Sequence, residues 1–174
     1  MNELGVLAAF IPEFAPIVAM MQFNMYHHYT VDEHTIQVIH HLAEIERGEL
    51  DEELPVSTEI IETGIDRKVL YVALLLHDIG KGRDEDHSIL GARIARTVAP
   101  RLGLNRRECE TVEWLVRYHL LMSDMAQKRD IADPRTVRDF AKAVKTVDRL
   151  NLLCVLTVCD IRGVGPGTWN NWKT

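Results

Sequence analysis

The segment that most constrains the fold of this chain is residues 69–81, with the sequence VLYVALLLHDIGK. Residues 69–76 have almost no polar face, which predicts a helix that is buried on all sides. His77 and Asp78 follow directly at the end of this apolar run. A carboxylate in such a place costs several kcal/mol unless a cation or several hydrogen-bond donors compensate its charge. This segment alone therefore indicates either a metal site or a buried His–Asp hydrogen bond that caps a core helix.

The two residues that close the segment have their own expected roles. Gly80 is expected to release the chain from the helix, because glycine is common just past a helix C-terminus. Lys81 follows and can face either solvent or an anionic ligand. A cation just beyond a helix C-terminus is also favoured by the helix dipole, so a solvated Lys81 without a functional role is the alternative.

Length, charge and cysteine content limit the classes of function. A chain of 174 residues suits one domain with a proper core. The net charge of −6 argues against binding to nucleic acid, which requires a basic face. No basic leader or run long enough to span a membrane is present, and the three cysteines form no CxxC pair. We therefore expect a cytoplasmic protein with no nucleic-acid or membrane partner.

Helical periodicity and capping residues predict an all-α fold, a helical bundle. Thr30 with Glu33, and Asn105 with Glu108, have the pattern of capping boxes. Asp66 is expected to cap the central helix, and either Asp86 or Ser88 the next, which should end before Pro100. Residues 17–29 form an apolar, methionine-rich segment that we interpret as core filler. Helices are expected at 4–11, 31–47, 57–63, 67–76, 87–99, 106–119, 120–128, 134–145 and 147–161.

Several ionisable residues recur at the ends of the expected helices, inside or beside apolar runs. Helix ends can converge on one pocket in a bundle, which is where bundles build metal sites. Nitrogen and oxygen ligands suit Zn, Mn, Fe, Ni or Co, with Mg possible, better than Ca or a thiolate-bound metal. Asp78 could bridge a pair of ions about 3.5–4 Å apart, an arrangement that stabilises phosphoryl transition states. The candidate ligands are His34, His77, Asp78, His87, His119 and Asp160.

The order of these residues resembles the H…HD…D pattern of the HD-domain metal-dependent phosphohydrolases. HDIGK at 77–81 is the form most typical of that superfamily, and its match rests on His34, the His77–Asp78 doublet and Asp160. The resemblance implies that these four residues hold a first metal ion. His87, within DHSILGA, and His119 resemble the additional histidines of members with two metals. They would hold a second ion, with Asp78 as the bridge.

A narrower resemblance spans nearly the whole chain. The phrases GVLAAFIPEF, YTVDEHT, LLLHDIGKGR, DHSILGA and LTVCDIRGVGPGTWNNWK are similar to the HD domain of bifunctional uridylyltransferase/uridylyl-removing enzymes. In that family, one domain adds UMP to a tyrosine of the nitrogen-signalling protein PII, and the HD domain removes it. C-terminal ACT domains sense glutamine. This chain shows no nucleotidyltransferase pattern, so the resemblance implies only the removal reaction, with uridylylated PII as partner.

The same resemblance implies the domain organisation. Residues 1–162 would be the HD phosphohydrolase domain, and residues 163–174 a linker toward further domains of the same full-length chain. The chain departs from the family by having two histidines, His27 and His28, before YTVDEHT, where one is common. We expect His27, His40 and His41 to be structural or surface residues, and leave open which of His27 and His28 faces the pocket.

Lys81 is the expected phosphate contact, as a flexible point charge, and Arg83 is a second, weaker candidate. Asp78 and Lys81 are therefore the expected catalytic residues. Two alternatives remain at this point. One is an HD hydrolase of another nucleotide, although no GYP-containing loop typical of cyclic dinucleotide phosphodiesterases is present. The other is a non-catalytic helical interaction module that has lost its metal.

Overall fold

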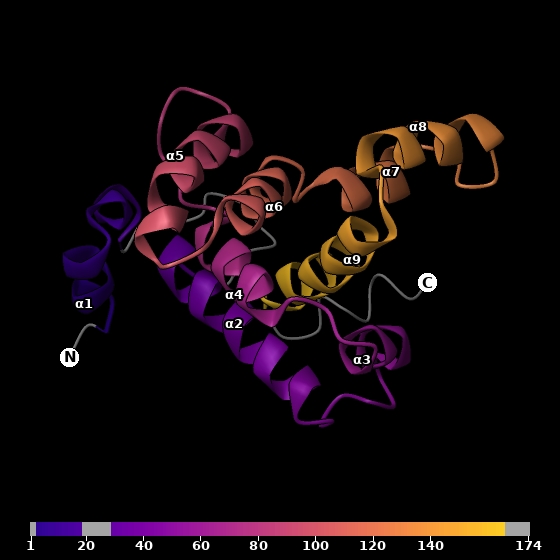
Figure 1. Ribbon diagram of the computed structural model, residues 1–174, viewed down its shortest axis with the longest axis horizontal. Coiled ribbons are helices and arrows are strands. Elements are labelled where there is room, and N and C mark those ends of the chain that lie inside the picture. Colours follow the sequence, from indigo (N-terminus) through magenta and orange to yellow (C-terminus); the bar gives the residue numbers. More distant parts are fainter. Residues whose placement is uncertain (1–2, 19–28, 166–174) are drawn as a thin grey trace.

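The computed structural model describes residues 3–18 and 29–165 (Figure 1). Within these residues the chain forms nine α-helices and one 3₁₀ helix, and no strand, which confirms the expected all-α fold. None of these helices combines the length and the apolar character needed to cross a bilayer. The elements are α1 Glu3–Phe10, η1 Pro12–Ile17, α2 Val31–Glu46, α3 Pro55–Glu62, α4 Arg67–Leu76, α5 His87–Arg101, α6 Arg106–Arg117, α7 Leu121–Lys128, α8 Pro134–Val144 and α9 Val147–Arg162.

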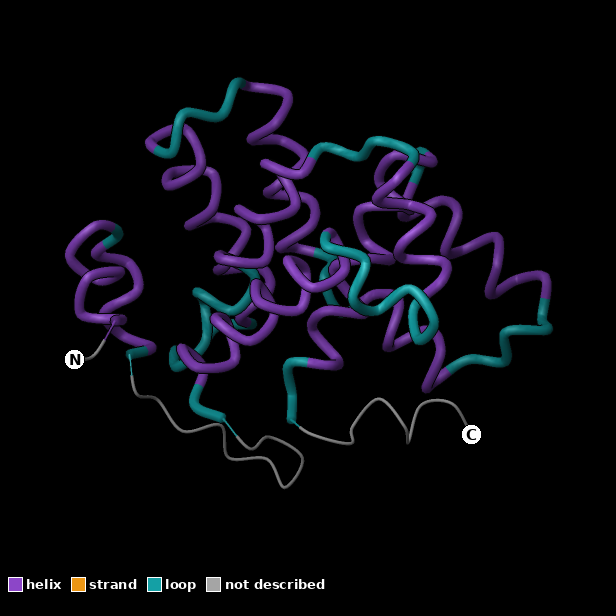
Figure 2. Tube along the Cα trace, turned by 90° about the horizontal axis from the view of Figure 1, so that it is seen from below, coloured by secondary structure: helices purple, strands orange, loops and turns teal. Residues whose placement is uncertain are grey.

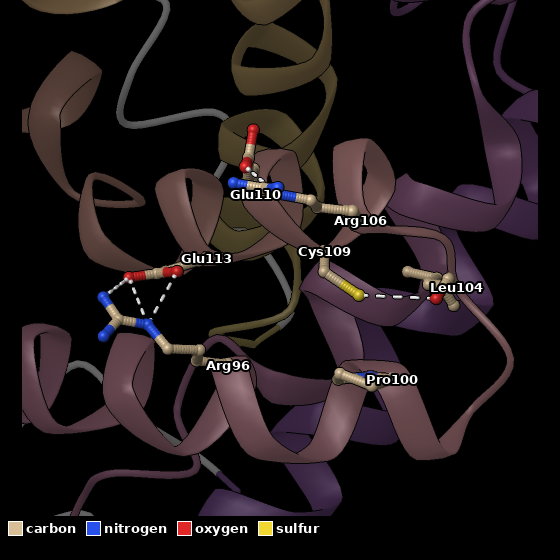
Figure 3. Close-up of a pocket in the computed structure, with 7 residues that line it drawn as sticks. All are labelled: Arg96, Pro100, Leu104, Arg106, Cys109, Glu110 and Glu113. Carbon is tan, nitrogen blue, oxygen red and sulfur yellow. Dashed lines mark hydrogen bonds and ion pairs between the residues drawn. The ribbon is translucent and has the colours of Figure 1, made fainter.

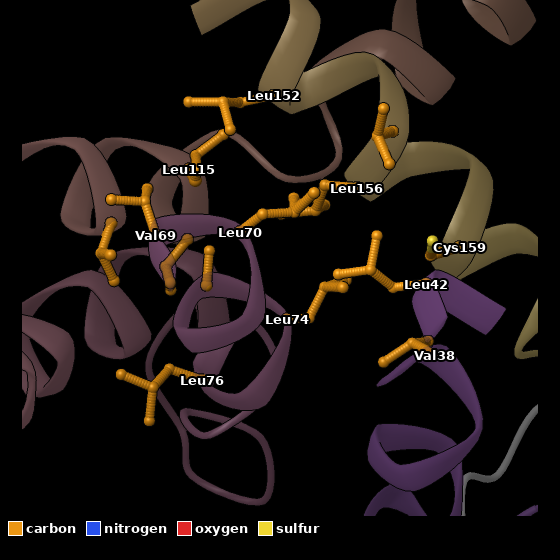
Figure 4. Close-up of a cluster of buried hydrophobic side chains, with 14 of the residues drawn as sticks. Val38, Leu42, Val69, Leu70, Leu74, Leu76, Leu115, Leu152, Leu156 and Cys159 are labelled. Atoms are coloured by element: carbon orange, nitrogen blue, oxygen red, sulfur yellow. The ribbon is translucent and has the colours of Figure 1, made fainter. Parts of the chain in front are cut away.

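Helix α4 lies at the centre and packs against α2, α5, α6 and α9 (Figure 1). Its side chains Leu70 and Leu74 are completely buried and meet residues of α2 and α9, among them Leu42 and Leu156 (Figure 4). The expectation of a helix buried on all sides is only partly correct. Tyr71, Val72 and Leu75 are half-buried, because no helix fully covers that side of α4.

The local capping signals are confirmed. Thr30 and Asn105 form the expected capping boxes at the starts of α2 and α6, and the Asp66 carboxylate accepts the Val69 amide of α4. Asp86, rather than Ser88, caps α5 by accepting the Ser88 and Ile89 amides. The end predicted for α5 is wrong, since the helix continues through Pro100 to Arg101. A proline in the last turn removes only one of the hydrogen bonds that hold the helix.

The remaining elements lie at the edges of this central group. Helices α7 and α8 pack on each other and on α9, and they form one end of the molecule (Figure 1). Helix α1 and η1 pack on each other at the opposite side (Figure 2), where an ion pair joins Glu13 to Arg101 at the end of α5. Most of the expected methionine-rich core segment, with His27 and His28, lies outside the described residues.

Candidate metal centre

The six predicted ligands come together at the inner ends of the helices around α4. His34 lies in the first turn of α2, and Asp160 lies in the last turn of α9. His77 is the C-cap of α4, with Asp78 next to it. His87 is the first residue of α5, and His119 follows the end of α6. Convergence of separate helix ends, inferred from the sequence, is thus the observed arrangement.

The first group of ligand atoms is the trio His34, His77 and Asp160. The Nε2 atom of His34 lies 2.8 Å from Oδ1 of Asp160 and 3.3 Å from Nε2 of His77. The distance from His77 Nε2 to Asp160 Oδ1 is 3.4 Å. Both histidines are buried, and the Asp160 side chain is 18% exposed, so the trio opens to solvent beside Asp160.

The second group is the trio Asp78, His87 and His119. The Nε2 atoms of His87 and His119 lie 3.8 Å and 3.6 Å from Oδ1 of Asp78. His119 is buried, whereas the His87 side chain is 27% exposed. The second trio therefore has its own opening to solvent, beside His87.

Asp78 joins the two trios through its two oxygens. Oδ1 faces His87 and His119, while Oδ2 lies 3.3 Å from His77 Nε2. Lys81 adds a charge at the same carboxylate, with its Nζ 2.9 Å from Oδ2. A carboxylate placed between two sets of nitrogen ligands is the geometry that a bridging ligand requires.

Three of the histidine rings are oriented by backbone carbonyls. Nδ1 of His34 lies 2.8 Å from Gly163 O, and Nδ1 of His77 lies 2.6 Å from Leu74 O. Nδ1 of His119 lies 2.7 Å from Val116 O. A carbonyl only accepts, so each Nδ1–H donates and leaves Nε2 as the atom directed into the site. This outer hydrogen bond is the usual partner of a metal-binding histidine.

The two ring nitrogens of His77 face different groups. Carbonyls in the last turn of a helix lack partners within the helix, and the His77 ring caps α4 by donating to Leu74 O. The opposite ring nitrogen remains directed toward Asp78 and Asp160. A histidine at the end of an apolar helix can therefore cap that helix and present a metal ligand at the same time.

The electrostatics favour a bound cation. Burial would raise the pKa values of Asp78 and Asp160, but the facing charge of His77 holds both far below their usual range. Burial would also lower the pKa of His77, but the same two carboxylates overcome it and raise this pKa to about 10. Asp78 is buried and Asp160 is only 18% exposed, so their two ionised carboxylates depend on neighbouring positive charge.

The residues present fit a divalent metal ion. Burial lowers the pKa of His87 and lowers that of His119 to about 4, so both rings are neutral at pH 7, as metal ligands must be. The Nε2 atom of His87 is buried without a hydrogen-bond partner among the described residues. A buried nitrogen without a partner costs free energy, which a metal ion would recover.

Gly80 has a different role from the one expected. It is absent from the glycines with positive φ, and α4 has already ended at Leu76. An added Cβ at Gly80 would lie 2.4 Å from His87 O and 2.7 Å from Gly91 N. The glycine is needed because the turn after Asp78 approaches the backbone of α5, and this approach brings His87 to the site.

The sequence reasoning missed Gly163, which supplies the carbonyl that orients His34. An added Cβ there would lie 2.5 Å from Val38 Cγ1 and 3.2 Å from His34 Cε1. The only available signal was a glycine shortly after Asp160, at the first position of the expected linker. The carbonyl partners Leu74 and Val116 carry no signal in the sequence, since every residue has a carbonyl.

The remaining predicted residues lie at or away from the site. Lys81 contacts Asp78, as described, whereas Arg83 is exposed on the loop between α4 and α5 and belongs to neither trio. His40 and His41 pair with Glu44 on α2, in agreement with a structural or surface role. The three cysteines are free, with Cys159 buried and Cys109 and Cys154 half-buried.

Comparison with known proteins identifies the family of this chain. The chain is 81% identical over 173 residues to the bifunctional uridylyltransferase/uridylyl-removing enzymes of Ruegeria pomeroyi and Cereibacter sphaeroides, and 61% identical to that of Azospirillum brasilense. Each match covers 99% of this chain but only 18–19% of the relative, so the chain spans about a fifth of their length. These relatives confirm the narrower resemblance found in the sequence. The model of the HD domain family matches residues 31–161, and the chain belongs to that family.

Proposed function

We propose that this chain is a metal-dependent phosphodiester hydrolase that removes UMP from a uridylylated tyrosine of a PII-type signal protein. The observation that carries the proposal is the pair of ligand trios joined by Asp78. The names of the relatives, which include a uridylyl-removing activity, supply the substrate class. The relatives are about five times longer, so the transferase activity named with them is expected in other parts of such chains.

In this proposal His34, His77 and Asp160 hold one divalent ion, and His87 and His119 hold a second, with Asp78 between them. The ions would supply positive charge to the phosphoryl group and acidity to water. The chain itself fixes the ring orientations through the Nδ1 hydrogen bonds. Mn, Fe, Zn, Ni, Co and Mg all remain candidates, because nitrogen and carboxylate sites accept several divalent ions.

Lys81 and the leaving group complete the proposed chemistry. The Lys81 side chain is 24% exposed, with its Nζ 2.9 Å from Asp78 Oδ2, and it would contact a nonbridging phosphate oxygen of the substrate. Arg83 is farther out, on the exposed loop, and would meet the substrate only at the rim. A tyrosine leaves as a phenolate with a conjugate-acid pKa near 10, so it needs less protonation than an aliphatic alkoxide.

The test is UMP release from a uridylylated PII-type protein in the presence of Mn²⁺. The double variant His77→Ala/Asp78→Ala is expected to lose both UMP release and metal binding, because it removes one ligand of the first trio and the carboxylate between the trios. His40→Ala is the matched control, since that side chain is 55% exposed, pairs with Glu44 and belongs to neither trio. It should retain both properties.

Three results would contradict the proposal. Full UMP release by the double variant would show that the trios are not the catalytic centre. Hydrolysis of free nucleotides from a panel, with no release from the modified protein, would indicate an HD hydrolase with another substrate. Metal content near zero after refolding with Mn, Fe or Zn would instead favour a non-catalytic module.

A further inference from the structure

A groove of about 550 Å³ runs between α5 and α6 and reaches the first turn of α9. It is distinct from the two ligand trios, and its lining combines cationic and aromatic side chains. The residues that matter here are Arg93, Arg96, Trp114, Arg117, Tyr118 and Arg149.

Four of these side chains form a stacked ladder that links α6 to α9. The guanidinium carbon of Arg117 lies 5.1 Å from the ring centre of Tyr118, and that of Arg149 lies 4.9 Å from the Trp114 ring. The Trp114 and Tyr118 rings are 5.5 Å apart. Stacking on a ring holds a guanidinium in place and leaves its in-plane N–H groups available to carboxylates. The two ladder arginines are thus held in advance of binding.

The carboxylates of the groove are already paired with other arginines. Glu113 binds Arg96, and Glu110 pairs with Arg106, as Figure 3 shows at the adjoining end of the same helices. Arg117 and Arg149 have no ion pair with a carboxylate among residues 3–18 and 29–165. The groove therefore carries surplus positive charge on a chain whose net charge is −6.

The groove begins beside the second ligand trio. Tyr118 immediately precedes His119, and Ile89, which lines the groove, is two residues after His87. Two lining residues of the groove are thus one and two positions along the chain from members of the second trio.

We propose that the ladder arginines Arg117 and Arg149 bind an acidic segment of the protein substrate next to the modified tyrosine. The proposal rests on the proposed function. A nucleobase is a poorer occupant, because Trp114 is only 8% exposed and each ring already has a guanidinium on it. Arginine forks pair with carboxylates in two-point hydrogen bonds, and charge complementarity of this kind gives specificity for a partner.

The experiment compares two substrates with the double variant Arg117→Gln/Arg149→Gln. One substrate is a uridylylated PII-type protein, and the other is the p-nitrophenyl ester of UMP, which has the same scissile bond type and no protein segment. We expect kcat/KM for the protein, relative to that for the ester, to fall about tenfold through KM, and the loss to shrink at high salt. Arg135→Gln, a 77% exposed arginine on α8, is the matched control and should not change this ratio.

The double variant Arg117→Lys/Arg149→Lys separates charge from packing. Because each ammonium keeps the positive charge, its KM for the protein substrate should lie between those of the wild type and the glutamine variant. An unchanged ratio in the glutamine variant would overturn the proposal. Equal losses for both substrates would also overturn it, since they would indicate a nucleotide contact or a role in folding. If the wild-type chain hydrolyses the ester but releases no UMP from the protein, the proposed function fails, and the acidic-segment proposal fails with it.

Discussion

At the scale of single residues, the orientation of the histidines depends on backbone atoms as much as on the ligands themselves. His34 is held from both sides, by Gly163 O at Nδ1 and by Asp160 at Nε2. The residues of the two trios could be selected from the sequence because their types and order are distinctive. The carbonyls could not, because a carbonyl is the same at every position and only the fold selects which one accepts.

Gly163→Ala is expected to weaken metal binding. Its Cβ would lie 2.5 Å from Val38 Cγ1 and would crowd His34 Cε1, so the ring and its hydrogen bond to Gly163 O must shift. Loss of such an outer hydrogen bond typically lowers metal affinity about 10- to 100-fold. Isothermal titration calorimetry with Mn²⁺ measures the change.

A second substitution provides the control for this prediction. Val38→Ala removes the Cγ1 atom that the new Cβ would meet, so Gly163→Ala/Val38→Ala should bind Mn²⁺ more tightly than Gly163→Ala alone. If the added space restores no affinity, the crowding described here is not the cause of the loss.

At the scale of elements, the helix starts followed from local signals, but their packing did not. The caps Thr30, Asp66 and Asn105 act within three residues of themselves, so a sequence pattern is enough to find them. The partly open side of α4 and the role of Gly80 depend on residues far along the chain. Those features could not be predicted, because no local pattern records which backbone a turn will approach.

Gly80→Ala is expected to affect the second trio selectively. The added Cβ would meet His87 O at 2.4 Å, so α5 must move away from the turn that carries Asp78. His87 moves with α5, whereas His34, His77 and Asp160 lie on other elements. We expect the bound metal to fall from about two ions per chain to about one, as measured by atomic absorption after dialysis.

Gly64→Ala is the comparison, because its Cβ would meet no atom within 4 Å, although its positive φ makes any side chain there strained. It should lower the melting temperature without changing the metal content. Equal metal loss in both variants would mean that the approach of α5 to Gly80 does not control the second trio.

At the scale of the whole molecule, metal binding is coupled to pH and to stability. The pKa of His77 is raised to about 10 in the metal-free protein, above its value of about 6.5 in an unfolded chain. The extra proton on His77 therefore stabilises the metal-free fold fully below about pH 6.5, and this stabilisation is lost as the pH rises toward 10. A metal ion that binds His77 would have to displace this proton. No proton needs to leave His87 and His119, which are already neutral at pH 7.

We expect Mn²⁺ binding to release about one proton at pH 7–8 and to strengthen about tenfold per pH unit in that range. Calorimetry in buffers of different ionisation enthalpy measures the released proton. Metal at 100 times its Kd should also stabilise the fold by about 2.7 kcal/mol, seen as a higher melting temperature that EDTA reverses. Binding without proton release would show that His77 is not a ligand.

The two residues that flank His34 come from the far end of the chain. Asp160 is 126 positions away from His34 in sequence, and Gly163 follows one turn later. During synthesis on the ribosome, the first trio therefore stays incomplete until Asp160 has left the exit tunnel, and the carbonyl that orients His34 follows three residues later. A chain interrupted before Asp160 has all residues of the second trio but not of the first, so an ion could bind the complete first trio only after residue 160 has been translated.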